Sequence, residues 1–124
     1  MQNKIIRLIA ISSYRSNAEK LYAQLKILNV NDIYKLQITK LMRKFKHDCL
    51  PSVFNYLFTK WDNIHSYNTR QQTSQEYIVP RKRLAIAQRS LAYIGVKIWE
   101  SLYQNLKVQP FYIFKKTCKL HFLN

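Results

Sequence analysis

Apolar residues in the first part of the chain recur with the spacing of α-helices. From Gln2 to Ser12 they fall on nearly every side of a helix, which predicts a first helix buried on most of its faces. Ser16 and Glu19 have the spacing of a capping box, so we expect a second helix to begin there. Its packing face would be an i, i+3, i+7 stripe made of Ala18, Leu21, Leu25 and Leu28.

The clearest helical pattern follows Asn31, a residue type that commonly caps helix N-termini. The pattern runs to about Asp48 and is ended by Pro51. One narrow face of this third helix carries the apolar residues Tyr34, Ile38, Leu41, Met42, Phe45 and Cys49. The basic residues lie off that face and predict a cationic surface made of Lys35, Lys40, Arg43, Lys44 and Lys46.

Periodicity weakens in the second half of the chain. Ser52 begins a short aromatic turn or helix through Phe58, and residues 59–83 then form a long polar connecting segment. Residues 84–96 are compatible with short extended or mixed structure, and Ile98 to Leu106 predicts a helix. Pro110 fits the first turn of a last helix. That helix would pack through Phe111, Phe114, Cys118 and Phe122 and keep Lys115, Lys116 and Lys119 off this face.

These patterns predict a mainly α protein. With one Gly and three Pro the chain has few places for sharp turns. We expect a small helical domain over residues 1–124, with a long basic connecting loop and room for a short β element. Its parts would be a helical region over 1–58, the loop over 59–83, and a mixed and then helical region over 84–124.

Composition adds a core and a large positive charge. The chain is 48% hydrophobic and 14% aromatic, which is sufficient for a packed interior. Lys and Arg total 21 against 6 Asp and Glu, for a formal net charge of +15 spread along the chain. Such an excess of positive charge favours binding to nucleic-acid phosphates, because neutralising the phosphates releases condensed counterions. The main competing partner is an anionic membrane surface.

The same features place the protein inside the cell. The stretches that lack charged residues are too short for a transmembrane helix. Arg7 interrupts the apolar run near the N-terminus and no small-residue cleavage site follows, so we expect no signal peptide and a nuclear or cytoplasmic location. Cys49 and Cys118 are then expected to be thiols in the core.

The candidate binding residues are cationic or aromatic. A helix face with Lys40, Arg43 and Lys44 could follow a phosphate backbone, and its alternative is a solvated helix face. A second group lies in the connecting segment, where Arg can hold phosphates and Tyr can stack on bases. Its members are Tyr67, Arg70, Arg81, Lys82 and Arg83. The alternatives for this group are a nuclear-localisation tract or an ordinary charged loop.

Catalytic and metal-binding sets are not evident. The acids are scattered singly, whereas two-metal phosphoryl transfer needs clustered carboxylates. His47, Cys49, Cys118 and His121 have the inventory of a zinc site, but the two pairs are far apart in the sequence and the cysteines fall on apolar faces. We therefore expect no catalytic residue, no metal and no cofactor in this chain. Trp61 and Trp99 are expected in the core.

Three short sequence blocks follow one another in the second half of the chain. They are His65-Ser66-Tyr67-Asn68-Thr69-Arg70, Val79-Pro80-Arg81-Lys82-Arg83 and Gly95-Val96-Lys97-Ile98-Trp99. This order resembles the region beyond the polymerase core in reverse transcriptases of non-LTR (LINE-type) retrotransposons. Earlier segments are similar to the same family: Gln2–Ile9, Leu25–Leu28 with Asp32–Tyr34, and Leu41–Phe45 with Leu50-Pro51. Unlike the family, the chain has Glu100 after Trp99, where Asn is usual.

The resemblance implies the C-terminal region of an RNA-directed DNA polymerase, without the fingers, palm and paired catalytic aspartates. Such a segment would hold template RNA or target DNA near a polymerase active site during target-primed reverse transcription. The expectation is a noncatalytic nucleic-acid-binding segment whose partners are RNA or DNA and the polymerase core of the parent element. The alternatives are a basic helical module for an acidic protein or anionic membrane, and a nonfunctional relic of a decayed element.

Overall fold

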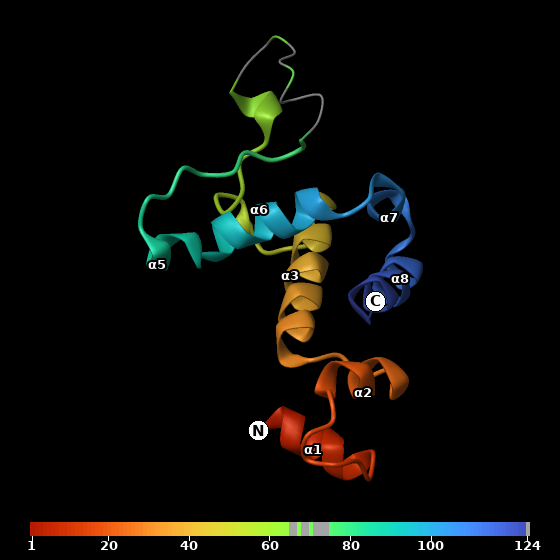
Figure 1. The fold of residues 1–124 in the computed structure, drawn as a ribbon. Helices are drawn as coiled ribbons and strands as arrows, with labels where there is room; N and C mark the ends of the chain where they lie inside the picture. Colours follow the sequence, from red (N-terminus) through yellow and green to blue (C-terminus); the bar gives the residue numbers. More distant parts are fainter. Residues whose placement is uncertain (65–66, 68–69, 71–74, 124) are drawn as a thin grey trace. The chain divides into compact units, whose positions relative to one another are not determined.

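The protein is mainly helical, which confirms the predicted fold class (Figure 1). The computed structural model describes residues 1–64, 67, 70 and 75–123. The α-helices it contains are α1 (Gln2–Ile9), α2 (Ala18–Gln24), α3 (Val30–Lys46), α5 (Ala85–Gln88), α6 (Leu91–Ser101), α7 (Gln104–Val108) and α8 (Phe111–Leu123). Two short 3-10 helices span Ser52–Phe54 and Trp61–Asn63. Extended pairing within the described residues is limited to one antiparallel bridge, between Lys60 and Tyr77.

The chain divides into two compact units. Unit 1 consists of Met1–Gln37 and Pro110–Asn124, and unit 2 of Ile38–Gln109. Helix α3 therefore begins in unit 1 and ends in unit 2. The sequence-predicted candidate binding residues all belong to unit 2.

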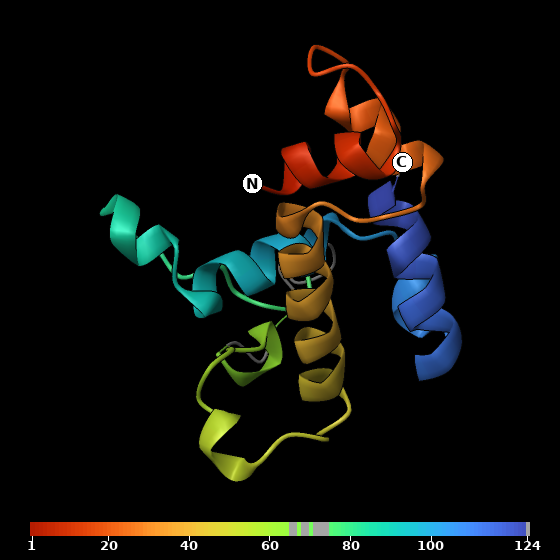
Figure 2. The ribbon, with the colours of Figure 1, turned by 90° about the horizontal axis from the view of Figure 1, so that it is seen from below.

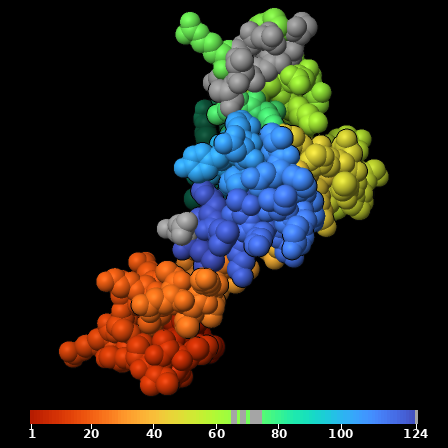
Figure 3. All heavy atoms as spheres, turned by 90° about the vertical axis from the view of Figure 1, so that its right-hand side faces the viewer, coloured from red at the N-terminus to blue at the C-terminus, as the bar shows by residue number. Residues whose placement is uncertain are grey.

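Helices α1 and α2 of unit 1, red to orange in Figure 3, lie against each other. They pack through a small apolar cluster. Its buried members are Ile6, Ala18, Leu21 and Tyr22. The prediction that α1 is buried on most of its faces was wrong, because Ile6 is its one buried residue and Leu8 is 78% exposed. Apolar residues all round a helix become buried only where neighbouring elements cover each side.

The helix starts differ from the predicted caps. The side chain of Asn17, not Ser16, caps α2, and its Oδ1 accepts the Glu19 N–H at 2.9 Å. Helix α3 begins two residues earlier than its predicted cap would allow, because Asn29 Oδ1 accepts the Asp32 N–H at 2.9 Å. Both caps use an Asn just before the first helical residue, where its side chain reaches an N–H that the helix leaves without a partner.

Three helix ends share a geometry that normally favours glycine. After α1, α2 and α3 the residues Ile11, Lys26 and Asp48 have φ values of 48°, 52° and 53°. Each is followed by a residue whose N–H donates back to the helix, at 3.0 Å from Ser12 to Arg7, 3.0 Å from Ile27 to Tyr22 and 2.9 Å from Cys49 to Lys44. This is the Schellman arrangement, which satisfies the last carbonyls of a helix.

The second half is more helical than predicted. Residues 84–96 were expected to be extended or mixed but contribute α5 and most of α6. The predicted helix over Ile98–Leu106 is interrupted, since Leu102 and Tyr103 have extended ψ values of 142° and 140° between α6 and α7. The last helix is confirmed, since α8 follows Pro110 and its three lysines are exposed. Of its predicted packing face, Phe114 and Cys118 are buried and Phe122 is half-buried, but Phe111 is 45% exposed.

Unit 2 has its core where α6 packs against α3 near Met42, and Figure 2 shows the two helices crossing. Met42 of α3 and Val96 and Trp99 of α6 are fully buried. Gly95 permits this packing, since a β-carbon there would lie 3.0 Å from the Phe58 ring and 3.3 Å from the Met42 sulfur. The single glycine of the chain thus stands at a close approach between α6 and its neighbours.

Two smaller expectations are also settled by the structure. Both cysteines are thiols, as predicted, but only Cys118 is buried, whereas Cys49 is exposed at the end of α3. Trp99 is a core residue, as predicted, and Trp61 is half-buried. Across the described residues, every helix is too short or too polar to traverse a lipid bilayer.

Candidate nucleic-acid interface

The predicted basic cluster Arg81–Arg83 directly follows a segment that is fixed by the core of unit 2. Backbone bonds join this segment to the chain before it, with the Ile78 N–H donating to the Thr59 carbonyl at 2.9 Å and the Trp61 N–H to the Glu76 carbonyl at 3.5 Å. The sequence predicted a structureless connection over residues 59–83. In the structure, residues 75–80 are partly or fully buried.

Tyr77 is the main apolar anchor of the segment. Its fully buried ring makes edge-on contacts with Phe45 and Phe58, at centroid distances of 5.9 and 6.3 Å. Burial raises the pKa of the Tyr77 hydroxyl far above its ordinary value, and the negative charges of Glu76, Glu100 and Asp48 raise it further. The hydroxyl is therefore neutral at physiological pH.

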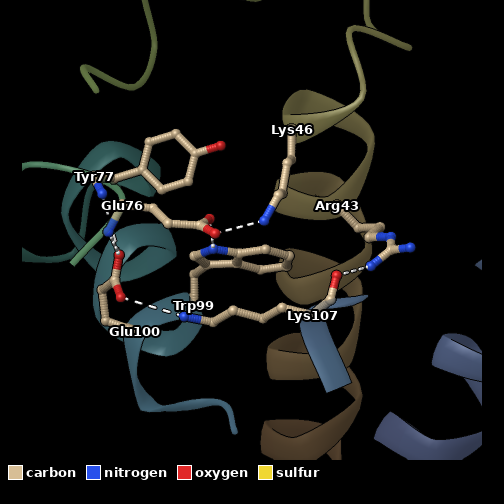
Figure 4. A network of polar contacts seen from close by, with 7 residues as sticks. All are labelled: Arg43, Lys46, Glu76, Tyr77, Trp99, Glu100 and Lys107. Atoms are coloured by element: carbon tan, nitrogen blue, oxygen red, sulfur yellow. Dashed lines mark hydrogen bonds and ion pairs between the residues drawn. The ribbon is translucent and has the colours of Figure 1, made fainter. Parts of the chain in front are cut away.

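Glu100 on α6 provides the main polar anchor (Figure 4). Its Oε1 accepts the backbone N–H groups of Glu76 at 2.9 Å and Tyr77 at 3.2 Å. Its Oε2 accepts from the Lys107 ammonium at 3.3 Å. Because Lys107 is only 2% exposed, one carboxylate both holds the segment and balances a buried charge.

Glu76 connects the segment to α3 and α6 (Figure 4). Its Oε2 accepts from the Trp99 indole N–H at 3.0 Å, and its Oε1 is paired with the Lys46 ammonium. Partial burial raises the pKa of Glu76, but hydrogen bonds from Lys46 and Trp99 and the charges of Lys46 and Lys107 outweigh it. The pKa of Glu76 therefore lies below its ordinary value.

Arg43 belongs to the interior of unit 2 and not to a basic surface. It is 4% exposed, and its guanidinium donates to the backbone carbonyls of Lys107 and Gln109. The placement of Arg43 on an exposed cationic face was wrong. Helical spacing put it off the main apolar face, but the segment after α6 covers it and offers two carbonyl acceptors that local sequence does not reveal.

The other sequence-predicted binding residues are at least partly accessible. Lys44, Arg81, Lys82 and Arg83 are exposed, and Lys40 is half-buried on α3. Tyr67 and Arg70 are also exposed. The neighbouring residues His65, Asn68 and Thr69, which belong to the first block of the family resemblance, lie outside the described residues.

Sequence reasoning missed the anchoring network itself. Its members Glu76, Glu100 and Lys107 come from three separate parts of unit 2, and none has a periodic pattern that would signal burial. The one local signal was the Trp99-Glu100 pair, where an acid directly follows a core tryptophan. In the sequence, Glu100 differs from the Asn that is usual at this place in the resembling family.

The network leaves an uneven balance of charge in unit 2. Of its four acids, Glu76 and Glu100 are engaged inside the network with Lys46 and Lys107, while Asp48 and Asp62 are exposed. Beyond Arg43, Lys46 and Lys107, unit 2 carries nine more cations: Lys40, Lys44, Lys60, Arg70, Arg81, Lys82, Arg83, Arg89 and Lys97. Folding thus concentrates positive charge at the surface of unit 2.

Neither a search for groups of metal-binding side chains nor a comparison with known proteins assigns a function to the chain. Within the described ranges, His, Cys, Asp and Glu side chains do not gather in groups of three that could hold a metal ion. Comparison of the chain with protein-family models, curated proteins and solved structures finds no match.

Proposed function

We propose that this chain is a noncatalytic nucleic-acid-binding segment that contacts the phosphate backbone of RNA or DNA through unit 2. The resemblance of its sequence blocks to the C-terminal region of LINE-type reverse transcriptases supports the same role. In that setting the segment would hold template RNA or target DNA beside a polymerase core.

The observation that carries the proposal is the inward placement of Glu76 and Glu100. Two of the four acids of unit 2 accept internal hydrogen bonds and pair with the buried ammonium group of Lys107 and the half-buried ammonium group of Lys46. Unit 2 carries nine other cations against two further acids, Asp48 and Asp62. A surface with this imbalance gains free energy from phosphates through counterion release.

The anchoring of residues 76–80 gives the cluster Arg81–Arg83 a defined starting point. Tyr77 is packed in the core and its backbone N–H is held by Glu100, four residues before Arg81. Cations that are positioned in the free protein lose less conformational entropy on binding than cations on an unanchored loop. Arg81 and Arg83 can each also hold a phosphate bidentately.

The cluster is tested by replacing Arg81, Lys82 and Arg83 together with Ala. These side chains are exposed, so the fold should be retained. We expect affinity for a fluorescein-labelled oligonucleotide, measured by anisotropy at low salt, to fall on the order of tenfold or more because several phosphate contacts are lost.

The matched control is a variant in which Lys115, Lys116 and Lys119 of α8 are replaced by Ala. These lysines are also exposed, and the variant loses the same number of positive charges. We expect this variant to lose much less affinity. Equal losses in both variants would assign the effect to net charge alone and contradict the assignment of the site to Arg81–Arg83. No binding of RNA or DNA by the unmodified chain would contradict the proposed function as a whole.

A further inference from the structure

A hollow of about 380 Å³ opens beside the anchored segment in unit 2. It is lined by Trp61, Gln75, Ile78, Val79, Pro80 and Arg81. This volume lies within the range of about 300–1,000 Å³ that is typical of small-ligand sites. Its walls combine one aromatic ring, aliphatic side chains and a few polar groups, which is the composition such sites usually have.

Trp61 contributes an aromatic surface and an unused hydrogen-bond donor. Its indole Nε1 is buried and has no hydrogen-bond partner within the described part of the chain. The indole N–H of Trp99, the fully buried tryptophan of unit 2, donates to Glu76 at 3.0 Å. A buried N–H that is left without an acceptor is costly, so the free protein leaves a donor of Trp61 unsatisfied beside the hollow that this residue lines.

The cationic cluster begins at the wall of this hollow. Arg81 lines it, and Lys82 lines a second hollow of about 210 Å³ that shares Ile78 and Pro80 with the first. A ligand with a planar, hydrogen-bonding ring joined to a phosphate would match both the walls and the charge. Unpaired nucleotides have this chemistry, whereas a base inside a duplex is already stacked and paired.

We infer that the hollow lined by Trp61 and Arg81 receives an unpaired base of single-stranded nucleic acid. The base contacts the Trp61 indole, and Arg81 contacts the adjoining phosphate. This inference rests on the proposed function and deepens it, because it assigns to unit 2 a preference for single strands. RNA and DNA strands share the chemistry and are compared as separate arms of the test.

The direct test uses the unmodified protein and changes only the ligand. Anisotropy at fixed low salt compares labelled single-stranded RNA, single-stranded DNA, the DNA duplex and a DNA strand in which every base is replaced by an abasic site. We expect the single strands to bind on the order of tenfold more tightly than the abasic strand, because stacking of one base on an aromatic side chain increases affinity by about this factor. The affinity for the duplex should be similar to the affinity for the abasic strand. Whichever of the RNA and DNA single strands binds more tightly is the type of strand that supplies the base.

A protein-side test uses Trp61→Ala, with Tyr112→Ala as the matched control. Tyr112 is an 80% exposed aromatic residue on α8 of unit 1 and is not one of the residues that line the hollow. Trp61→Ala should lose on the order of tenfold for single strands and little for the duplex, and Tyr112→Ala should lose little for either.

The outcomes separate the two proposals. Equal affinity of the unmodified protein for the normal and abasic strands overturns the base site but leaves backbone binding intact. Equal losses in Trp61→Ala and Tyr112→Ala also overturn the base site. No binding of any strand at low salt overturns both the base site and the proposed function.

Discussion

At the scale of single residues, the two carboxylate oxygens of Glu100 have different tasks. Oε1 holds the backbone of Glu76 and Tyr77, and Oε2 balances the buried Lys107 ammonium. Trp99 adds to this balance, since the Lys107 Nζ lies 5.5 Å from the centroid of its ring. A change at Glu100 therefore affects both the anchored segment and a buried charge.

Glu100→Gln should show which of these tasks is more costly to lose. The amide keeps an oxygen for the two N–H groups but leaves the Lys107 ammonium without its counter-charge. We expect the free energy of unfolding to fall by about 3 kcal/mol, the cost of breaking a buried ion pair from one side. Urea unfolding of the full chain measures it.

The double variant Glu100→Gln/Lys107→Met provides the control, because it removes both charges. It should lose clearly less stability than the sum of the two single variants. Additive losses, or a single-variant loss close to zero, would show that the pair is not coupled.

Glu76 should make the stability of unit 2 depend on acidic pH. Its pKa is lower in the folded protein than the ordinary Glu value of about 4.3, so the unfolded chain takes up a proton first as the pH falls. The stabilisation is present above the ordinary pKa and is lost as the pH falls through the lower, folded value. Urea unfolding at stepped pH should show the unmodified chain losing stability in this range.

Glu76→Gln supplies the comparison for the pH experiment. It should be less stable than the unmodified chain at neutral pH, and the difference between the two should shrink as the pH falls below the ordinary Glu value. A difference that stays constant over this range would contradict the assigned role of the Glu76 carboxylate.

At the scale of elements, the ends of α1, α2 and α3 use left-handed residues that are not glycine. Ile11 is the most strained of them, because a β-branched side chain rarely adopts positive φ. It is also 95% exposed, so its side chain contributes little burial. The Schellman hydrogen bonds of α1 hold it in this conformation.

Ile11→Gly should therefore stabilise the protein, whereas most glycine substitutions destabilise. Relief of the left-handed conformation is worth about 1 kcal/mol, which thermal unfolding can detect. The control is Ile5→Gly, at an exposed position inside α1, which should destabilise by about 1 kcal/mol. A loss of stability in Ile11→Gly would contradict the helix end described for α1.

The elements also show how far the sequence alone could lead. The approximate positions of α2, α3 and α8 could be predicted because their apolar residues recur at helical spacing and Pro110 marks a start. Helices α5 and α6 could not be predicted, since apolar residues on several sides obscure the helical period. The exposure of α1 depends on which neighbours cover it, and local sequence does not contain that information.

The candidate site divides in the same way. The cluster Arg81–Arg83 could be found from the local sequence alone, because three basic residues follow one another. The burial of Arg43 could not, because its carbonyl partners on Lys107 and Gln109 are 64 and 66 residues away in sequence. The same holds for Glu76 and Glu100, which are brought together only when α6 packs in unit 2.

At the scale of the whole molecule, the proposed binding to phosphates depends on the formal net charge of +15. In unit 2 the anchoring network engages two of the four acids, and the remaining cations have few counter-charges. Backbone binding that depends on this charge must weaken as salt is added, because the entropy gained from counterion release decreases.

The salt dependence of binding tests this account most directly. Affinity of the full chain for a single-stranded oligonucleotide is measured by anisotropy over a series of salt concentrations, for the unmodified chain and for the variant without Arg81, Lys82 and Arg83. We predict a steep linear fall of log affinity with log salt, and a slope that is shallower by about 2 in the variant, as the loss of three contacts at about 0.7 each requires. A flat dependence, or an identical slope in both proteins, would contradict it.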